Sequence, residues 1–226
     1  MTLENKNDSN EVQILSAVEN FKYFKESLSE EEIINVMSDL KHRIFPRPFE
    51  RLSNLRLCQD LVGAEIGVAG GEHALSLLET LSIKKLYLID PYDIYDAYTE
   101  GKQHYGAGGA GLNKFKASAE KLLSRFSDRI IWISELSSDA ADSITEELDF
   151  VYIDGNHAED FVSQDINNFF PKLSSRGVIG GHDFYNGFQR EHDGVVSAVL
   201  SSAGLKDFQM RVEIPDWWVE INDKKN

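Results

Sequence analysis

The sequence is short of cysteine, of basic residues and of long apolar runs, and each shortage excludes a class of protein. Its single cysteine excludes an internal disulfide framework and suits a reducing compartment. No apolar stretch reaches the roughly 18 residues that a membrane-spanning helix requires. The polar start MTLENKNDSN lacks the apolar core of a signal peptide. We therefore expect a cytoplasmic protein that binds no membrane.

Acidic residues outnumber basic ones by 38 to 23 and give the chain a formal net charge of −15. Such a chain repels a phosphate backbone, so nucleic acid is not an expected partner. We interpret the acidity as a source of solubility. The 226 residues, 42% of them hydrophobic, suffice for one α/β domain with a helical extension.

Two amphipathic helices are expected near the start of the chain, over residues 11–25 and 30–44. Their apolar residues recur at helical spacing, and two prolines then end the helical region. We assign residues 1–60 to an N-terminal helical extension and residues 61–226 to the main domain. The helices are apolar enough to pack against a second subunit, so a homo-oligomer is a hypothesis that the sequence raises.

From residue 61 onward, strand patterns alternate with helix patterns. This alternation predicts an α/β fold with a Rossmann-like, doubly wound and mainly parallel sheet. A terminal hairpin would add antiparallel strands to that sheet. The expected strands cover residues 61–68, 85–90, 129–134, 149–154 and 177–183, and the hairpin covers residues 208–214 and 217–221.

The first expected strand ends in a glycine-rich turn, EIGVAGG, that suits S-adenosylmethionine. Gly67 and Gly71, with Val68 between them, let the backbone approach a ligand closely. The helix that follows offers N–H groups to the carboxylate of the ligand. Glu65 suits its ammonium group, and Asp90, at the end of the second strand, can accept hydrogen bonds from both ribose hydroxyls.

A dinucleotide fits this turn less well than S-adenosylmethionine does. Ala69 breaks the G-x-G-x-x-G fingerprint of dinucleotide-binding turns. Glu65 would also repel a pyrophosphate. Two alternatives remain, namely a nicotinamide dehydrogenase and a glycine turn that serves only the packing of helix on strand.

Four segments in sequence order, EIGVAGGEHA, LYLIDPY, FVYIDGNHAEDFVSQDI and GVIGGHDF, resemble the class I S-adenosylmethionine-dependent methyltransferases. The resemblance covers residues 61–221 and is closest to the branch of sugar and macrolide O-methyltransferases and cephalosporin-hydroxylase-like proteins. It implies a seven-stranded sheet in the order 3-2-1-4-5-7-6. It also implies that Ser137 and Ser138, after the third strand, wall the adenine. The chain departs from the family pattern at His73, where a small residue is usual, and at HAED, where H-x-Y-E is usual.

Three polar residues follow neighbouring strands and are candidate metal ligands. Asp154 ends the fourth expected strand, and His182 and Asp183 end the fifth. Because ligands bind outside the carboxyl ends of parallel strands, we expect these side chains at one rim, where Asp154 also borders the cofactor. Two carboxylates suit a hard divalent cation. The resemblance to metal-dependent O-methyltransferases implies a similar set, with His182 in place of an oxygen ligand, so the ion is Mg, Mn or another divalent metal such as Fe or Zn.

His157, three residues after Asp154, is the expected general base. A bound cation would lower the pKa of a substrate hydroxyl, and an imidazole can take its proton near neutral pH. The sequence therefore favours O-methylation of a small-molecule acceptor, with a sugar, polyketide-type or phenolic hydroxyl. The alternatives are a metal-independent methyltransferase that uses His157 alone and a protein that binds S-adenosylmethionine without chemistry.

Each candidate of the rim also has a structural interpretation. Asp154 can cap the loop to the next helix, His157 can start that helix, and His182 can point into the fold. Elsewhere, the glycine-containing segment 91–111 is a candidate substrate lid. The two tryptophans of the hairpin are candidates for the core or for an aromatic platform under the substrate.

Overall fold

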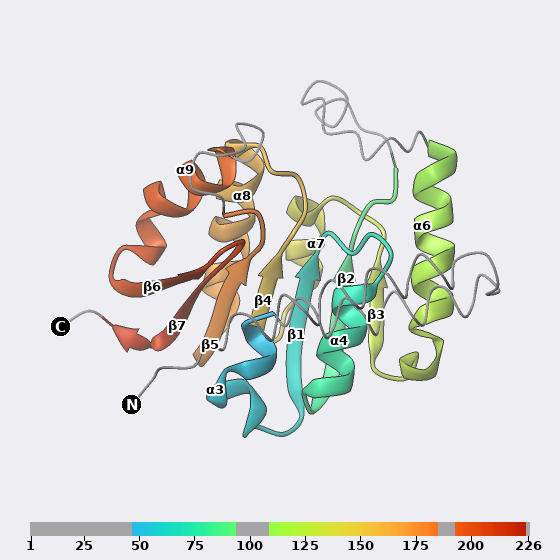
Figure 1. Ribbon diagram of the computed structural model, residues 1–226, viewed down its shortest axis with the longest axis horizontal. Helices are drawn as coiled ribbons and strands as arrows, with labels where there is room; N and C mark the ends of the chain where they lie inside the picture. Colours follow the sequence, from blue (N-terminus) through green and yellow to red (C-terminus); the bar gives the residue numbers. More distant parts are fainter. Residues whose placement is uncertain (1–46, 94–108, 185–192, 225–226) are drawn as a thin grey trace, which may run out of the picture. The chain divides into compact units, whose positions relative to one another are not determined.

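The computed structural model describes residues 47–93, 109–184 and 193–224 of the chain. The chain divides into two compact units, Met1–Pro46 and Arg47–Asn226, and the fold below is that of the second unit (Figure 1). The helices predicted within residues 11–44, and most of the predicted lid at 91–111, lie outside the described residues.

The strands form one seven-stranded sheet in the order β3-β2-β1-β4-β5-β7-β6, which confirms the order that the family resemblance implied. β7 runs antiparallel to both β5 and β6, and the other neighbouring strands pair in parallel. The predicted hairpin is therefore confirmed as well. The strands are β1 (Leu61–Ile66), β2 (Ile83–Ile89), β3 (Ile130–Ile133), β4 (Leu148–Ile153), β5 (Leu173–Gly181), β6 (Phe208–Glu213) and β7 (Asp216–Lys224).

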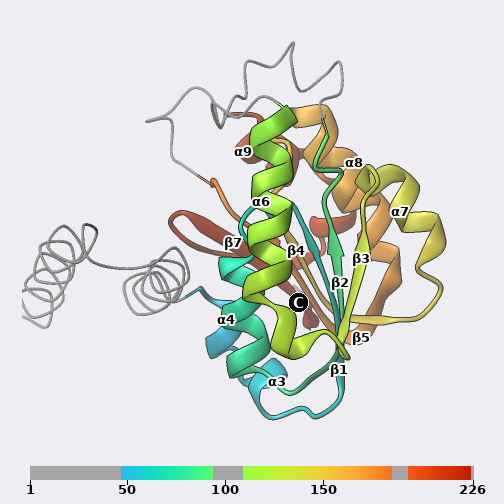
Figure 2. The ribbon, with the colours of Figure 1, turned by 90° about the vertical axis from the view of Figure 1, so that its right-hand side faces the viewer.

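Helices cover both faces of the sheet (Figure 2). Apolar residues of α4 and of the segment after α6 pack on one face, and those of α7, α8 and α9 pack on the other. Among the described helices, none is long and apolar enough to cross a bilayer. The helices are α4 (Glu72–Thr80), α6 (Gly109–Leu122), α7 (Ser137–Ser143), α8 (Glu159–Phe169) and α9 (Asp193–Ser201).

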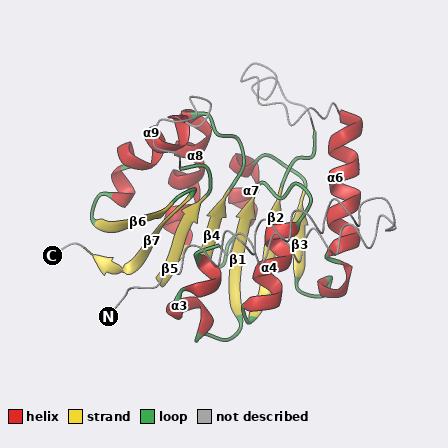
Figure 3. Ribbon diagram, in the orientation of Figure 1, coloured by secondary structure: helices red, strands yellow, loops and turns green. Residues whose placement is uncertain are grey.

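The central strand β4 shows how the sequence produces this layered core. All of its residues but Asp149 are buried, as expected for a parallel strand covered on both faces. Because side chains alternate along a strand, Phe150 and Tyr152 belong to one hydrophobic core and Val151 and Ile153 to the other. The loops that follow the parallel strands lie together at the carboxyl edge of the sheet (Figure 3).

A short segment before β1 is part of this core. It forms a 3-10 turn, η1 (Phe49–Arg51), and one helical turn, α3 (Ser53–Arg56). The ring of Phe49 is fully buried and lies edge-on to Tyr152, with 5.3 Å between ring centroids. The compact unit therefore begins at Arg47, earlier than the domain boundary that we predicted at residue 61.

The two tryptophans of the hairpin, Trp217 and Trp218, are both buried. They follow one another in β7, so they point to opposite faces, and each belongs to a different one of the two cores. They are core residues, and the alternative of an aromatic substrate platform is wrong.

Candidate active site

The glycine turn after β1 packs directly against the end of β4. Gly67 has a φ of +82°, and a Cβ atom at this position would lie 2.0 Å from the carbonyl oxygen of Asp154. Only glycine combines this backbone conformation with such a close approach. The predicted cofactor turn and the predicted metal ligand Asp154 are therefore neighbours in space.

The side chain of Asp90, directly after β2, is hydrogen-bonded to the backbone of this turn. Its Oδ2 atom accepts hydrogen bonds from the backbone N–H groups of Val68 at 2.9 Å and Ala69 at 3.1 Å, and its Oδ1 atom accepts one from Tyr92 at 2.9 Å. The carboxylate thus orders the turn itself. A ribose bound as predicted would share these oxygens with the backbone.

Tyr92 is a residue of the turn that sequence reasoning missed. It is buried, has a positive φ of 48°, and donates its hydroxyl hydrogen to the carbonyl oxygen of Ala69 at 3.0 Å. Burial raises the pKa of its phenol well above the ordinary value, so the hydroxyl stays a donor. The only sequence signal was its position directly after Asp90-Pro91.

Glu65, the residue predicted to meet the ammonium group, is almost fully buried. Its Oε1 atom lies 2.9 Å from Nδ1 of His73 on α4. The imidazole of His73 also lies against Tyr152, with 4.1 Å between ring centroids. His73, the departure from the family pattern, is therefore a partner of the carboxylate at the end of β1.

Ser137 and Ser138 begin α7, directly after the loop that leaves β3. The hydroxyl of Ser137 donates a hydrogen bond to the buried carboxyl of Asp165 on α8. Burial raises the pKa of Asp165 to about 7, although the bond from Ser137 lowers it. Ser137, one of the two residues predicted to contact the adenine, is thus hydrogen-bonded to α8, the helix that follows the loop after β4.

Backbone hydrogen bonds between the parallel strands align the strand ends at which the predicted metal ligands lie. Asp154 donates its backbone N–H to Ile66 at 2.7 Å, and His182 donates its own to Ile153 at 3.0 Å. Asp183 then turns back with a φ of 60°, a left-handed conformation that aspartate tolerates better than most residues. The ends of β1, β4 and β5 therefore lie level with one another.

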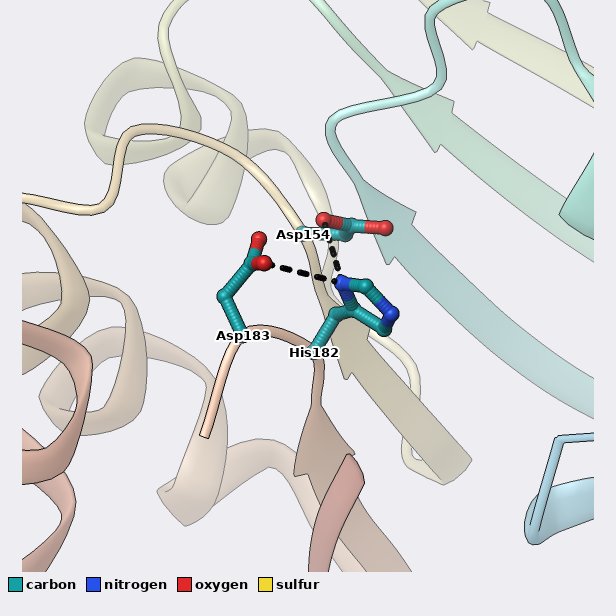
Figure 4. A group of neighbouring side chains, drawn as sticks. All are labelled: Asp154, His182 and Asp183. Atoms are coloured by element: carbon teal, nitrogen blue, oxygen red, sulfur yellow. Dashed lines mark ion pairs between the residues drawn. The ribbon is translucent and has the colours of Figure 1, made fainter. Parts of the chain in front are cut away.

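Asp154, His182 and Asp183 converge at this rim (Figure 4). Each offers a ligand atom, and these atoms lie within 4.8 Å of one another. Nδ1 of His182 is 3.9 Å from Oδ1 of Asp154 and 3.3 Å from Oδ1 of Asp183. His182 thus points toward the two carboxylates, and its alternative interpretation as a residue turned into the fold is wrong.

His157 contacts the oxygen of Asp183 that does not face His182. Its Nε2 atom is 2.9 Å from Oδ2 of Asp183, and both side chains are buried. Burial lowers the pKa of His157, but the hydrogen bond and charge of Asp183 outweigh that effect and leave it raised. Burial raises the pKa of Asp183, yet its bonds with His157 and His182 hold it well below the ordinary value, so the carboxylate is ionised.

A buried arginine that the sequence did not single out completes the surroundings of Asp154. Arg47 donates a hydrogen bond from Nη1 to the hydroxyl of Tyr152, and the same atom lies 3.3 Å from Oδ1 of Asp216. Its Nη2 atom is 3.9 Å from Oδ2 of Asp154. Burial raises the pKa of Asp154, while His182 and Arg47 lower it, and the net direction is upward.

Comparison with known proteins agrees with this geometry. A family model described as "Methyltransferase domain" matches residues 64–184, more than half of the chain. No curated protein matches the sequence. Solved structures resemble the fold of this chain even where few residues are identical, as three examples illustrate.

The chain resembles CalS11, a calicheamicin methyltransferase, with a TM-score of 0.67 and 13% identity over 98% of this chain and 95% of that one. It resembles the S-adenosylhomocysteine-bound methyltransferase PaMTH1 of Podospora anserina with a TM-score of 0.56 and 12% identity, over 100% of this chain and 99% of that one. It also resembles a putative rRNA methylase from Clostridium thermocellum, with a TM-score of 0.50 and 16% identity over 74% and 90%. At such identities these likenesses establish the fold alone.

Proposed function

The chain belongs to the methyltransferase domain family and is an S-adenosylmethionine-dependent enzyme, and we propose that it methylates a hydroxyl oxygen of a small molecule with the help of a divalent cation. The observation that supports this proposal best is the convergence of Asp154, His182 and Asp183 within 4.8 Å. The turn at Gly67 touches Asp154, so a methyl donor held by that turn lies beside the cation site.

The donor set fits a divalent cation. Two carboxylates and one imidazole face one another, and the ionised state of Asp183 supplies negative charge. Asp154, His182 and Asp183 would hold the ion, and this mixed set suits Mn, Fe or Zn as well as Mg. When bound, the ion would lower the pKa of an acceptor hydroxyl and so favour the oxyanion near neutral pH.

His157 would take the proton of that hydroxyl. Asp183 orients the imidazole and stabilises the imidazolium that forms, in the manner of other histidine–aspartate pairs. The hydroxyl oxygen would then take the methyl group of S-adenosylmethionine, with a carbon–oxygen bond formed as the carbon–sulfur bond breaks, and S-adenosylhomocysteine would leave. The rest of the chain would hold the donor and the acceptor in the orientation that the reaction requires. Such orientation supplies a large part of the rate acceleration in reactions of this kind.

A small molecule is a better acceptor than nucleic acid for this chain. The net charge of −15 opposes a phosphate backbone, which weighs against the rRNA that two structural relatives are named for. The apo form of CalS11 is named as a TDP-rhamnose 3'-O-methyltransferase, which makes sugar hydroxyls the first acceptors to test. Polyketide-type and phenolic hydroxyls follow.

The test is methyl transfer from labelled S-adenosylmethionine to a panel of nucleotide sugars, macrolides and catechols, before and after exhaustive treatment with EDTA. We expect the chelator to abolish turnover and Mn²⁺ or Mg²⁺ to restore it, while the affinity for S-adenosylhomocysteine stays the same. Turnover that survives EDTA would contradict metal assistance and favour the metal-independent reaction with His157 as the base.

A further inference from the structure

The two oxygens of the Asp154 carboxylate face different neighbours. Oδ1 faces Nδ1 of His182, and Figure 4 shows the other oxygen turned away from this contact. That second oxygen, Oδ2, is the one 3.9 Å from Nη2 of Arg47. The guanidinium thus approaches the Asp154 carboxylate at one oxygen and His182 approaches it at the other.

Arg47 is itself held firmly. Its side chain is 9% exposed, and its Nη1 atom contacts the Tyr152 hydroxyl and, at 3.3 Å, Oδ1 of Asp216. Tyr152 donates its own hydrogen bond to the same Asp216 oxygen. The three groups lie on three separate segments, namely the chain before η1, β4 and β7. Their network fixes the guanidinium from the interior of the fold.

We propose that Arg47 is a positioning residue for Asp154: it engages Oδ2 and so presents Oδ1 alone to the cation at the rim. This inference rests on the proposed function, because it takes Asp154 as a ligand of that cation. A carboxylate without such an anchor can rotate or bind an ion through both oxygens. Partners behind the ligands of a metal fix the geometry of those ligands and their loss weakens binding.

The charges around the rim agree with this role. One guanidinium faces the carboxylates of both Asp216 and Asp154, so it cannot neutralise both, and the rim keeps negative charge that suits a divalent ion. Arginine also suits the position for a geometric reason. Its planar fork serves Tyr152 and Asp216 through one nitrogen and reaches Asp154 through another, which a single lysine ammonium cannot do.

The experiment compares Arg47→Lys with Arg51→Lys. Both substitutions keep the charge and lie in the same segment. The exposed side chain of Arg51 pairs with Glu213 at 2.9 Å and donates to the backbone carbonyl of Arg47 at 3.5 Å, and neither contact involves Asp154. Calorimetric titration of the full chain with Mn²⁺ should show binding weakened about tenfold in Arg47→Lys and unchanged in Arg51→Lys. The affinity for S-adenosylhomocysteine should stay at the wild-type value in both, which separates a positioning role from general damage to the fold.

Wild-type Mn²⁺ affinity in Arg47→Lys would overturn the positioning role, since charge alone would then suffice. Asp154→Asn distinguishes that failure from failure of the proposed function. If Asp154→Asn binds Mn²⁺ as tightly as wild type, the cation site itself is wrong. If Arg47→Lys does not fold, Tyr152→Phe takes its place, because it removes one anchor of the guanidinium. Mn²⁺ binding in this variant should weaken about threefold, which is less than the roughly tenfold loss expected when the partner of a metal ligand is itself replaced. Unchanged binding in that variant would also overturn the proposal.

Discussion

Asp165 is a carboxyl group in the middle of α8 that is only 2% exposed and accepts a hydrogen bond from Ser137. Burial raises its pKa to about 7. In the unfolded chain an aspartate has a pKa of about 3.9, so the folded state binds this proton more tightly. The wild-type protein therefore loses stability as the pH rises from about 4 to about 7.

We expect Asp165→Asn to remove this loss. The amide keeps an oxygen for Ser137 and carries no charge, so the variant should be more stable than wild type at pH 8 by roughly 2–4 kcal/mol, with no such advantage at pH 4. Urea unfolding at both pH values measures the difference. Asp160→Asn, on the exposed side of the same helix, serves as the control. Parallel pH dependence in Asp165→Asn and wild type would refute the expectation.

His157 belongs to the residue scale as well, because its proposed role depends on one neighbour. Asp183 raises its pKa above the ordinary 6.5 despite burial. A base works only when unprotonated, so methyl transfer should increase with pH, with its midpoint on the alkaline side of 6.5. In His157→Gln the acidic limb should disappear and kcat should fall by about 10²–10⁴-fold, with unchanged affinity for S-adenosylhomocysteine. A variant with wild-type kcat would exclude His157 as the base.

At the scale of elements, the turn between β1 and α4 determines where the cofactor meets the rim. Gly67→Ala would place a Cβ atom 2.0 Å from a backbone oxygen at a φ of +82°. Relief requires β1 and β4 to separate, at a cost of about 3 kcal/mol or more. Gly155→Ala is the matched control, because its nearest neighbour would be a side-chain carbon at 3.4 Å.

Denaturant unfolding and calorimetry with S-adenosylhomocysteine should separate these two glycine variants. We expect Gly67→Ala to lose both stability and cofactor affinity, and Gly155→Ala to unfold within about 1 kcal/mol of wild type. Equal behaviour of the two would show that the contact between turn and strand end is not a constraint.

The elements were largely predictable because their signals are local. Apolar runs that alternate with helix patterns predicted the strands, and the family resemblance implied their order in the sheet. Asp154 and Asp183 could be placed together because each follows the carboxyl end of one of two neighbouring strands. Local signals also have a limit. Asp90 was predicted to face a ribose, and nothing in its spacing indicated that its oxygens would also accept the backbone N–H groups of the turn.

At the scale of the whole molecule, the interactions that escaped prediction connect residues far apart in the sequence. Arg47 lies 105 positions from Tyr152 and 169 from Asp216. A lone arginine between two prolines carries no periodic pattern and no motif, so only the folded structure reveals its partners. The predicted boundary at residue 61 lies after the start of the compact unit, because the core partners of Phe49 are also distant in the sequence. Phe49 becomes a core residue only when β4 packs against it.

This difference in boundary gives a test on two fragments. Fragment 47–226 corresponds to the compact unit and should unfold cooperatively and bind S-adenosylhomocysteine within about threefold of the full chain, because its core is complete. Fragment 61–226 lacks the buried side chains of Phe49 and Leu55 and leaves Asp216 without its guanidinium. Lost core contacts cost about 2–5 kcal/mol each, and an orphaned buried charge costs about 3–5 kcal/mol.

Together these losses match the 5–15 kcal/mol by which a typical domain is stable. Fragment 61–226 should therefore show no cooperative thermal transition by circular dichroism and no calorimetric binding of the cofactor product. A fragment 61–226 as stable as fragment 47–226 would mean that residues 47–60 only lie on the domain. Failure of both fragments would instead show that Met1–Pro46, although a separate compact unit, is required for the stability of the second.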